Sequence, residues 1–363
     1  MSMLSLWISR VNPTLLVLLT TISITPSVAE DWPVFRGPDR NGIANPGIIE
    51  TSGNVAELWT AEVGLGYSAP VVSEGKLVIT GHDGAETDTI FCLAEDTGEE
   101  LWTFSYPQPL GDLYFQGGTT GTLTFDGDRL FHVAREGEIF CLDANNGAVI
   151  WKRDLQKEFG YSKPTWGFTG APLVIGDRVY FTAGESGLAH NKNDGAEIWK
   201  SKNEEAGYAS PFPILRGETQ YLIFTNKRFY VCVRADNGKI VWEHRWMTRY
   251  GVNAADPVAS EDLLFISSGY GKGAVLLSWD GSGKPEKVWQ NRDLRTQMNA
   301  AVLIDGYLYG VDGNESVDGT GLKCLELATG ETRWTDLSVG HGTVSAVGDQ
   351  LVVIGEMGTL QIG

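Results

Sequence analysis

The sequence predicts an all-β fold, a β-propeller of four-stranded blades with seven repeats in this chain. Two observations predict it. Seven tryptophans recur at intervals of 43 to 49 residues, and short strand-forming runs separated by Gly- and Asp-rich turns fill each interval. Four short strands in about 45 residues are typical of one propeller blade. The tryptophans that end the repeats are Trp59, Trp102, Trp151, Trp199, Trp242, Trp289 and Trp334.

Each repeat is expected to hold four strands in a fixed order. In the first complete repeat, a strand of small residues covers 68–72, a second strand covers 76–79 and a third covers 90–93. The Thr97-Gly98 turn then leads to the outer strand that carries Trp102. Glycine suits this turn because tight hairpins need residues at positive φ. The tryptophan is predicted to pack between neighbouring blades, where an aromatic side chain buries about 150–250 Å².

We divide the chain into a signal peptide at 1–29, an N-terminal extension at 30–54 and the propeller at 55–363. An apolar run followed by small residues up to Ala29 predicts cleavage there and export to the periplasm or the exterior. The apolar run is shorter than the ~20 residues of a membrane helix, so no transmembrane segment is expected in the mature chain. The strand at 55–60 is expected to become the outer strand of the last blade and close the ring. The alternative is a truncated eight-bladed propeller, because the sequence stops inside a strand.

Charge and cysteine spacing limit the kinds of ligand. The chain has 28 Lys and Arg against 46 Asp and Glu, a net charge of −18, which excludes a nucleic-acid partner that needs a basic surface. Each of the four cysteines stands ten residues before its tryptophan, at a position that Ala189 and Trp279 hold in two other repeats. Equivalent positions in different blades lie beyond the reach of a disulfide, so we predict buried apolar thiols. The four are Cys92, Cys141, Cys232 and Cys324.

No motif of a hydrolase or a zinc enzyme occurs, so no catalytic residue is assigned. The glycine-rich run 269–273 lacks the Ser or Thr of a phosphate loop and is interpreted as a hairpin. Asp312, Asn314 and Asp318 stand at alternate positions, as in a calcium loop, although a solvated hairpin is the favoured interpretation.

One mouth of the ring is the candidate binding site. The starts of the inner strands crowd this mouth, and the sequence places aromatic residues with a few polar groups there, which is typical of a ligand site. The alternative is a purely structural role, in which these side chains fill the channel. The candidates are Tyr67, Trp166, Tyr208, Arg249, Tyr250, Asn253, Met298, Asn299 and His341.

The repeat that runs from Ala69-Pro70-Val71-Val72 to Trp102 resembles the pyrroloquinoline quinone (PQQ) repeat, and the resemblance extends from Val55 to the C-terminus. The segments 31–42, 166–168 and 249–255 resemble exported PQQ-like repeat proteins of the branch related to BamB, an outer-membrane assembly lipoprotein. Two features depart from the family patterns. The chain has no adjacent cysteine pair of the kind found in PQQ dehydrogenases, and no cysteine near its N-terminus for a lipid.

The resemblance implies an exported, non-enzymatic and monomeric scaffold for protein–protein interaction. It further implies an envelope protein partner, a role in cell-envelope or outer-membrane protein assembly, and no cofactor. The alternative is a PQQ- and calcium-dependent alcohol or sugar dehydrogenase. That enzyme would hold the quinone in the aromatic mouth, with Asn253 and Asp256 as calcium ligands. A third hypothesis is a carbohydrate-binding propeller, in which the aromatic rings stack on sugars.

Overall fold

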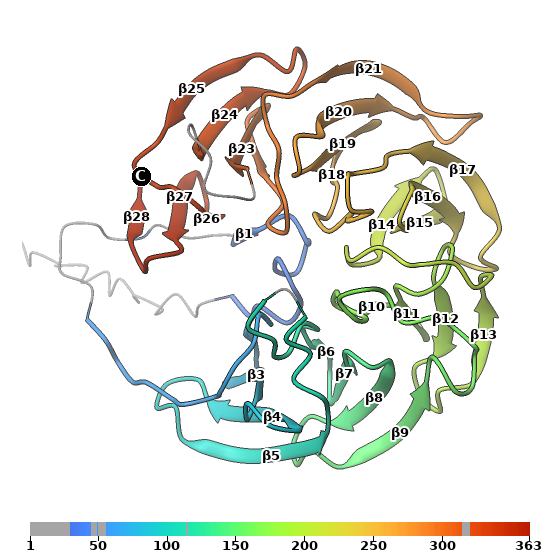
Figure 1. The fold of residues 1–363 in the computed structure, drawn as a ribbon, viewed down its shortest axis with the longest axis vertical. Coiled ribbons are helices and arrows are strands. Elements are labelled where there is room, and N and C mark those ends of the chain that lie inside the picture. Colours follow the sequence, from blue (N-terminus) through green and yellow to red (C-terminus); the bar gives the residue numbers. More distant parts are fainter. Residues whose placement is uncertain (1–29, 45–48, 50–55, 114, 314–319) are drawn as a thin grey trace, which may run out of the picture.

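The computed structural model describes residues 30–44, 49, 56–113, 115–313 and 320–363. In these ranges all the regular structure is β, with 28 strands in seven four-stranded sheets. The sheets surround a common axis like the blades of a propeller (Figure 1). The predicted all-β propeller of seven repeats is therefore confirmed. The predicted signal peptide lies outside the described residues, and within them no helix is long and apolar enough to cross a membrane.

Six of the seven blades each use four consecutive strands, from the inner strand to the outer one. Blades 1 to 3 contain β2 (Val71–Ser73), β3 (Lys76–His82), β4 (Thr87–Ala94), β5 (Glu100–Pro107), β6 (Thr124–Asp126), β7 (Arg129–Val133), β8 (Glu138–Asp143), β9 (Val149–Asp154), β10 (Leu173–Ile175), β11 (Arg178–Phe181), β12 (Leu188–Asn191) and β13 (Glu197–Lys200).

Blades 4 to 6 contain β14 (Phe212–Arg216), β15 (Thr219–Thr225), β16 (Phe229–Arg234), β17 (Ile240–Arg245), β18 (Val258–Ser260), β19 (Leu263–Ser268), β20 (Gly273–Ser278), β21 (Glu286–Asn291), β22 (Val302–Ile304), β23 (Tyr307–Asp312), β24 (Gly321–Glu326) and β25 (Thr332–Asp336). Blade 7 combines β1 (Ile43–Ala44) with β26 (Gly342–Val347), β27 (Gln350–Gly355) and β28 (Leu360–Ile362).

The repeated cysteines all face the repeated tryptophans. Cys92, for example, pairs with Trp102 across β4 and β5, and a β-bulge follows it directly. All four cysteines are buried and free, as predicted. Trp279 is not at this position, contrary to the prediction, because residues 279–285 lengthen the hairpin and place Leu276 opposite Trp289.

In most blades the tryptophan of the outer strand packs on the hairpin of the following blade. The indole Nε1 of Trp102 donates to the carbonyl of Ala144 at 3.1 Å. Gly147 of the same hairpin has a φ of 71°, and a Cβ there would lie 2.6 Å from the Trp102 ring. The hairpin glycine therefore provides both the turn and the space for the neighbouring indole. The same arrangement joins Trp151 to Gly195, Trp199 to Gly238 and Trp289 to Gly330.

The interface between blades 4 and 5 differs. Trp242 is buried, its ring meets Trp279 edge to face at a centroid distance of 5.7 Å, and its Nε1 has no partner in the described residues. The hairpin glycine of blade 5, Gly283, has open space around it. The longer hairpin thus exchanges the indole–glycine contact for an indole–indole contact.

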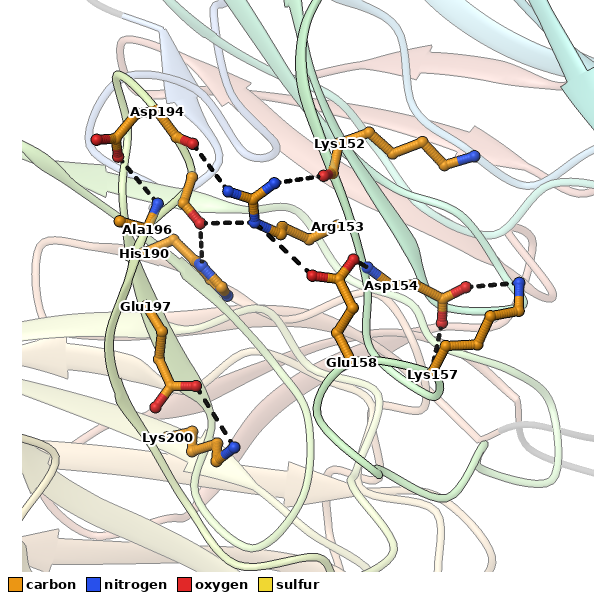
Figure 2. Close-up of polar contacts among 11 residues, drawn as sticks. Lys152, Arg153, Asp154, Lys157, Glu158, His190, Asp194, Ala196, Glu197 and Lys200 are labelled. Carbon is orange, nitrogen blue, oxygen red and sulfur yellow. Dashed lines mark hydrogen bonds and ion pairs between the residues drawn. The ribbon is translucent and has the colours of Figure 1, made fainter.

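Polar side chains add a further link between blades 2 and 3. Figure 2 shows Arg153 of β9 reaching the β12–β13 hairpin, where its guanidinium donates to the carbonyls of Gly195 at 3.0 Å and Asp194 at 3.1 Å. The Nδ1 of buried His190 donates to the same Gly195 carbonyl, 2.9 Å away. Glu158 lies 3.8 Å from Arg153, so the cation is held on both sides.

The N-terminal segment joins the last blade at its inner edge, not at its outer edge. The short strand β1 pairs in parallel with β26. Residues 56–60 belong to no strand, so the expectation of an outer strand at 55–60 is wrong for them, while Val55 lies outside the described residues. Trp59 nevertheless docks on blade 1 as the other tryptophans dock on theirs, with Nε1 donating to the Glu95 carbonyl at 2.9 Å. Trp59 therefore fits the spacing of the tryptophans because it makes the same contact with a hairpin, although it does not lie in a strand.

Candidate functional site

The centre of the ring holds the chain's own N-terminal segment, residues 31–44, which we call the N-terminal plug (Figure 1). Trp32 exchanges two backbone hydrogen bonds with Val72 of β2, and the carbonyl of Pro33 accepts from Phe125 of β6. The carbonyl of Gly42 accepts from Ala346 of β26. The plug therefore joins the first, second and last blades through backbone bonds alone.

Arg36 ties the plug to blade 6. Its side chain is buried, and its two terminal nitrogens donate to the carbonyls of Ala300 and Ala301 at 2.8 Å each, just before β22. One of these nitrogens also reaches the Asn41 carbonyl at 2.8 Å and so holds the turn of the plug. Arg36 has a φ of 66°, in the left-handed region that side chains other than glycine rarely adopt. The backbone strain persists because the guanidinium is held at several points.

Arg40 reaches the opposite part of the ring. Its guanidinium donates to the carbonyl of Pro172 before β10 at 2.7 Å, and burial lowers its pKa to about 10. Its second terminal nitrogen, Nη1, has no hydrogen-bond partner in the described residues. The two arginines together carry two buried positive charges into the middle of the ring.

Asp256 is the carboxylate that balances these cations. It is buried two residues before β18, and its Oδ1 accepts from the backbone amide of Ser210 at 2.8 Å. Burial raises the pKa of Asp256, and the charges of Arg36 and Arg40 oppose that rise. Asp256 and the two arginines therefore form one buried electrostatic group, supplied by the plug and blade 5.

This charge arrangement does not fit the calcium site of a PQQ enzyme. Calcium takes six to eight oxygen ligands, whereas the surroundings of Asp256 include two guanidinium cations that would repel it. The other expected ligand, Asn253, is fully buried, and its Nδ2 donates to the carbonyls of Asn226 and Trp246. Asn253 is thus committed to holding the β17–β18 connection.

The second calcium hypothesis concerned Asp312, Asn314 and Asp318. Asp312 is fully buried and bonds to Arg295 and Lys323. Burial alone would raise its pKa, but the bonds from the two cations outweigh burial and lower the pKa below its usual range. Asn314 and Asp318 lie outside the described residues. Within the described ranges no three His, Cys, Asp or Glu side chains gather closely enough to hold a metal ion.

The aromatic candidates at the mouth of the ring meet in neighbouring pairs. Trp166 and Tyr208 contact edge to face with centroids 5.7 Å apart, and they come from the connections before β10 and β14. Burial raises the pKa of Tyr208 above its usual range. Tyr67 is 56% exposed and lies 5.6 Å from the ring of Phe115.

The remaining candidates are largely exposed. The guanidinium of Arg249 lies 5.3 Å from the ring centroid of Tyr250, and both side chains are exposed. Met298 is 62% exposed, while Asn299 donates to the Gly342 carbonyl at 3.2 Å. His341 is partly exposed. Asn253 is the one candidate of the nine that is fully enclosed, and the binding role of the others stays a prediction.

Sequence reasoning missed Arg36 and Arg40. Both belong to the segment 31–42, which drew attention through resemblance and not through its chemistry. The available signal was Arg36-Gly37 and Arg40-Asn41-Gly42, two cations beside glycines in a short non-repeating stretch. Such a stretch has no periodicity, so neither its burial nor its partners followed from the pattern.

Three comparisons place the fold among known proteins. A family model described as outer membrane protein assembly factor BamB matches residues 86–336. BamB from Moraxella catarrhalis has a similar structure, with a TM-score of 0.57, 17% identity, and 79% of this chain and 81% of that chain covered. A europium-containing methanol dehydrogenase is also similar, with a TM-score of 0.64, 13% identity, and coverage of 92% and 85%.

The computationally designed Ika8 protein is a further structural relative, with a TM-score of 0.55, 14% identity, and coverage of 81% and 82%. No curated protein sequence matches the chain. Identities this low show a common fold, which scaffolds and dehydrogenases alike adopt. The family match spans more than half of the 363 residues, so the chain belongs to the family of the outer membrane protein assembly factor BamB, as its repeats predicted.

Proposed function

We propose that the protein is an exported, monomeric, non-enzymatic scaffold that binds an envelope protein and acts in outer-membrane protein assembly, in the periplasm or as a secreted protein. Membership of the BamB family supports this role. The observation that carries the proposal is a set of exposed apolar side chains on one face of the ring. We call this the connection face. It is formed by the described residues of the segments that lead into each blade, 56–70, 108–113, 115–123, 155–172, 201–211, 246–257, 292–301 and 337–341.

Seven large side chains on the connection face are exposed: Leu58, Tyr67, Leu113, Met247, Tyr250, Met298 and Leu337. Met298 is 62% exposed and Tyr67 is 56% exposed, and these two lie on separate connections. Leu113, Met247 and Tyr250 are each between 45% and 50% exposed. Tyrosine and methionine are enriched at protein interfaces, and exposed apolar groups favour a partner that removes them from water. A protein partner on this face is therefore the best-supported function.

The dehydrogenase alternative has less support from the residues. Of the two residues expected to hold calcium, Asp256 lies near two guanidinium cations and Asn253 donates to backbone carbonyls. A PQQ enzyme needs a metal to polarise the quinone. The carbohydrate hypothesis keeps the Trp166–Tyr208 pair as its basis, since such rings stack on sugars.

Site-specific photocrosslinking tests the scaffold. A photoreactive residue replaces Met298 or Tyr67, and the matched control replaces Lys284, an exposed residue in the β20–β21 hairpin on the opposite face. We expect one envelope protein to crosslink at Met298 and Tyr67 but not at Lys284, and deletion of the gene to lower outer-membrane protein levels. Equal crosslinking at all three positions, or unchanged protein levels, would count against the scaffold.

A separate assay tests the enzyme alternative. The purified protein is incubated with PQQ and calcium, and dye reduction is followed with alcohols and sugars. We expect no turnover above that of a heat-denatured sample. Calcium-dependent turnover would replace the scaffold with the dehydrogenase.

A further inference from the structure

A cleft between blades 4 and 5 collects positive charge on this acidic protein. Its volume is about 450 Å³, and we call it the cationic cleft. Arg249 comes from the β17–β18 connection and Lys272 from the β19–β20 hairpin. Lys287 lies on β21 and Arg292 directly follows that strand. Three segments that are separate in the sequence therefore bring four cations to the same space.

The charge in the cleft is not balanced by acidic side chains. Four of the ten lining residues are Lys or Arg and none is Asp or Glu, although acidic residues outnumber basic ones by 46 to 28 in the chain. Two nearby acidic side chains are bound elsewhere: Asp262 pairs with Arg216, and Asp312 pairs with Arg295 and Lys323. The cleft thus presents several positive charges to solvent together.

The surrounding groups respond to this charge. The Lys272 ammonium lies 4.4 Å from the ring centroid of Trp246, which is buried and donates to Ser268 Oγ at 3.1 Å. Partial burial lowers the pKa of Lys272, and the nearby Arg245 and Arg292 lower it further. Burial lowers the pKa of His244 on β17, and Lys272 and Lys287 add to that effect. Two side chains on different blades therefore experience the same positive field.

We propose that the cationic cleft binds an anionic ligand that carries two or three phosphate groups. A phosphate bears about 1.5 to 2 negative charges at neutral pH, so two or three of them balance the four cations. Arginine forks bind phosphate oxygens in pairs, and lysine adds a compact point charge. The volume lies within the range of small-molecule sites. This inference does not depend on the proposed scaffold function.

An acidic peptide is a poorer match. Each carboxylate brings one charge, so a peptide would need about four acidic side chains with their backbone in the same space to balance the cleft. Phosphate groups supply that charge in a smaller volume and with more acceptor oxygens for each group. The high density of cations in a small polar cleft therefore favours phosphate.

Calorimetry with sodium tripolyphosphate tests the cleft. The substitutions Lys272→Gln and Arg292→Gln, alone and together, remove cations from it, and Lys284→Gln makes the same charge change in blade 5 at the exposed hairpin. We expect tripolyphosphate binding to the parent protein to weaken with rising salt. Each single variant should bind at least about tenfold more weakly than the parent protein, whereas Lys284→Gln should bind with unchanged affinity. Absence of binding by the parent protein, or equal binding by the double variant, would overturn the proposal.

The stability of the ligand-free variants shows whether a loss of binding comes from the cleft alone or from unfolding of the protein. Because like charges repel, the double variant should unfold at or above the temperature of the parent protein. NMR titration of His244 gives a second readout: bound tripolyphosphate should raise the pKa of its imidazole, because it neutralises Lys272 and Lys287. An unchanged His244 titration with bound ligand would place that ligand elsewhere and overturn the assignment.

Two further arms identify the ligand class. A tetraglutamate peptide at the same concentration should bind at least about tenfold more weakly than tripolyphosphate, and equal binding would overturn the choice of phosphate. Vesicles of phosphatidylcholine with and without phosphatidic acid separate a lipid source from a free one. Binding to phosphatidic acid vesicles that Lys272→Gln abolishes supports a lipid headgroup, and binding of tripolyphosphate without vesicle binding supports a soluble ligand.

Discussion

At the residue scale, a buried polar chain links blades 1 and 2. The Tyr106 hydroxyl donates to Asp88 Oδ2 at 3.2 Å and lies 2.8 Å from Nε2 of His132. Burial raises the pKa of Asp88 to about 6 and lowers the pKa of His132 to about 3. The two groups therefore titrate far from their usual ranges, and each makes the stability depend on pH.

The substitution His132→Gln should change the pH dependence of stability. The unfolded chain takes up a proton on this histidine below about pH 6.5, and the folded protein does so only near pH 3. The stabilisation is complete above about pH 6.5 and is lost as pH falls toward 3, by up to about 1.4 kcal/mol per pH unit. In His132→Gln this loss should disappear in denaturant unfolding between pH 4 and 7.

The control for this prediction is His341→Gln, which changes a partly exposed histidine. Asp88 acts with the opposite sign over part of the window, because its raised pKa favours the folded state at lower pH. Comparison of each variant with the parent protein at every pH removes that contribution. Parallel stability curves for His132→Gln and the parent would show that the imidazole is not buried in its neutral form.

At the element scale, the contact between indole and hairpin glycine is the repeated unit that spaces the blades. The glycine is needed for two reasons: it adopts a positive φ, and it leaves room for the neighbouring ring. Comparison of hairpin glycines with and without a ring beside them separates the two effects. Gly147 has both, since its φ is 71° and a Cβ would meet the Trp102 ring at 2.6 Å. Gly283 has a φ of 60° with open space around it.

Two alanine substitutions, Gly147→Ala and Gly283→Ala, separate the effect of the positive φ from the effect of the packed ring. Gly283→Ala should cost about 1–2 kcal/mol of unfolding free energy, the price of left-handed backbone for alanine. Gly147→Ala should cost about 1–3 kcal/mol more, because the indole must also shift. Chemical denaturation of both variants gives the difference. If the two losses are equal, the Trp102 ring does not pack against the glycine as described.

At the scale of the whole molecule, the N-terminal plug links the last blade to the first. Its backbone joins blades 1, 2 and 7, while Arg36 reaches blade 6 and Arg40 reaches blade 3. Asp256 of blade 5 balances both cations. Removal of the plug would leave this carboxylate buried without its counter-charges, so the blades and the plug are expected to form one cooperative unit.

The substitution Arg36→Gln should weaken the whole ring. Glutamine cannot reproduce the fork that satisfies Ala300 and Ala301, and each unsatisfied buried carbonyl costs about 1–3 kcal/mol. We expect a loss of about 2 kcal/mol or more, together with faster hydrogen exchange in β1 and β26. The control Arg333→Gln breaks exposed ion pairs with Glu326 and Glu331 and should cost at most about 1 kcal/mol. Equal losses would show that the plug does not hold the ring.

Parts of the fold that repeat were predictable, and parts that occur once were not. The spacing of Trp102 and its equivalents predicted the blades, and the cysteines were correctly placed in the core. The prediction for Trp279 was wrong because a longer hairpin shifted the count while leaving the sequence spacing intact. Of the candidate site, Asn253 belongs to the backbone network, and the charged group of Arg36, Arg40 and Asp256 did not emerge as a unit.

The sequence by itself determined the seven-repeat propeller, the position of the tryptophan seams and the membership of a PQQ-like family. These follow from local patterns, since each strand, turn and indole contact repeats within about 45 residues. Only the tertiary structure decided that β1 joins the last blade at its inner edge, that the N-terminal plug occupies the centre, and that three separate segments form the cationic cleft. Each of these arises once, from residues far apart in the chain, and periodicity contains no information about such contacts.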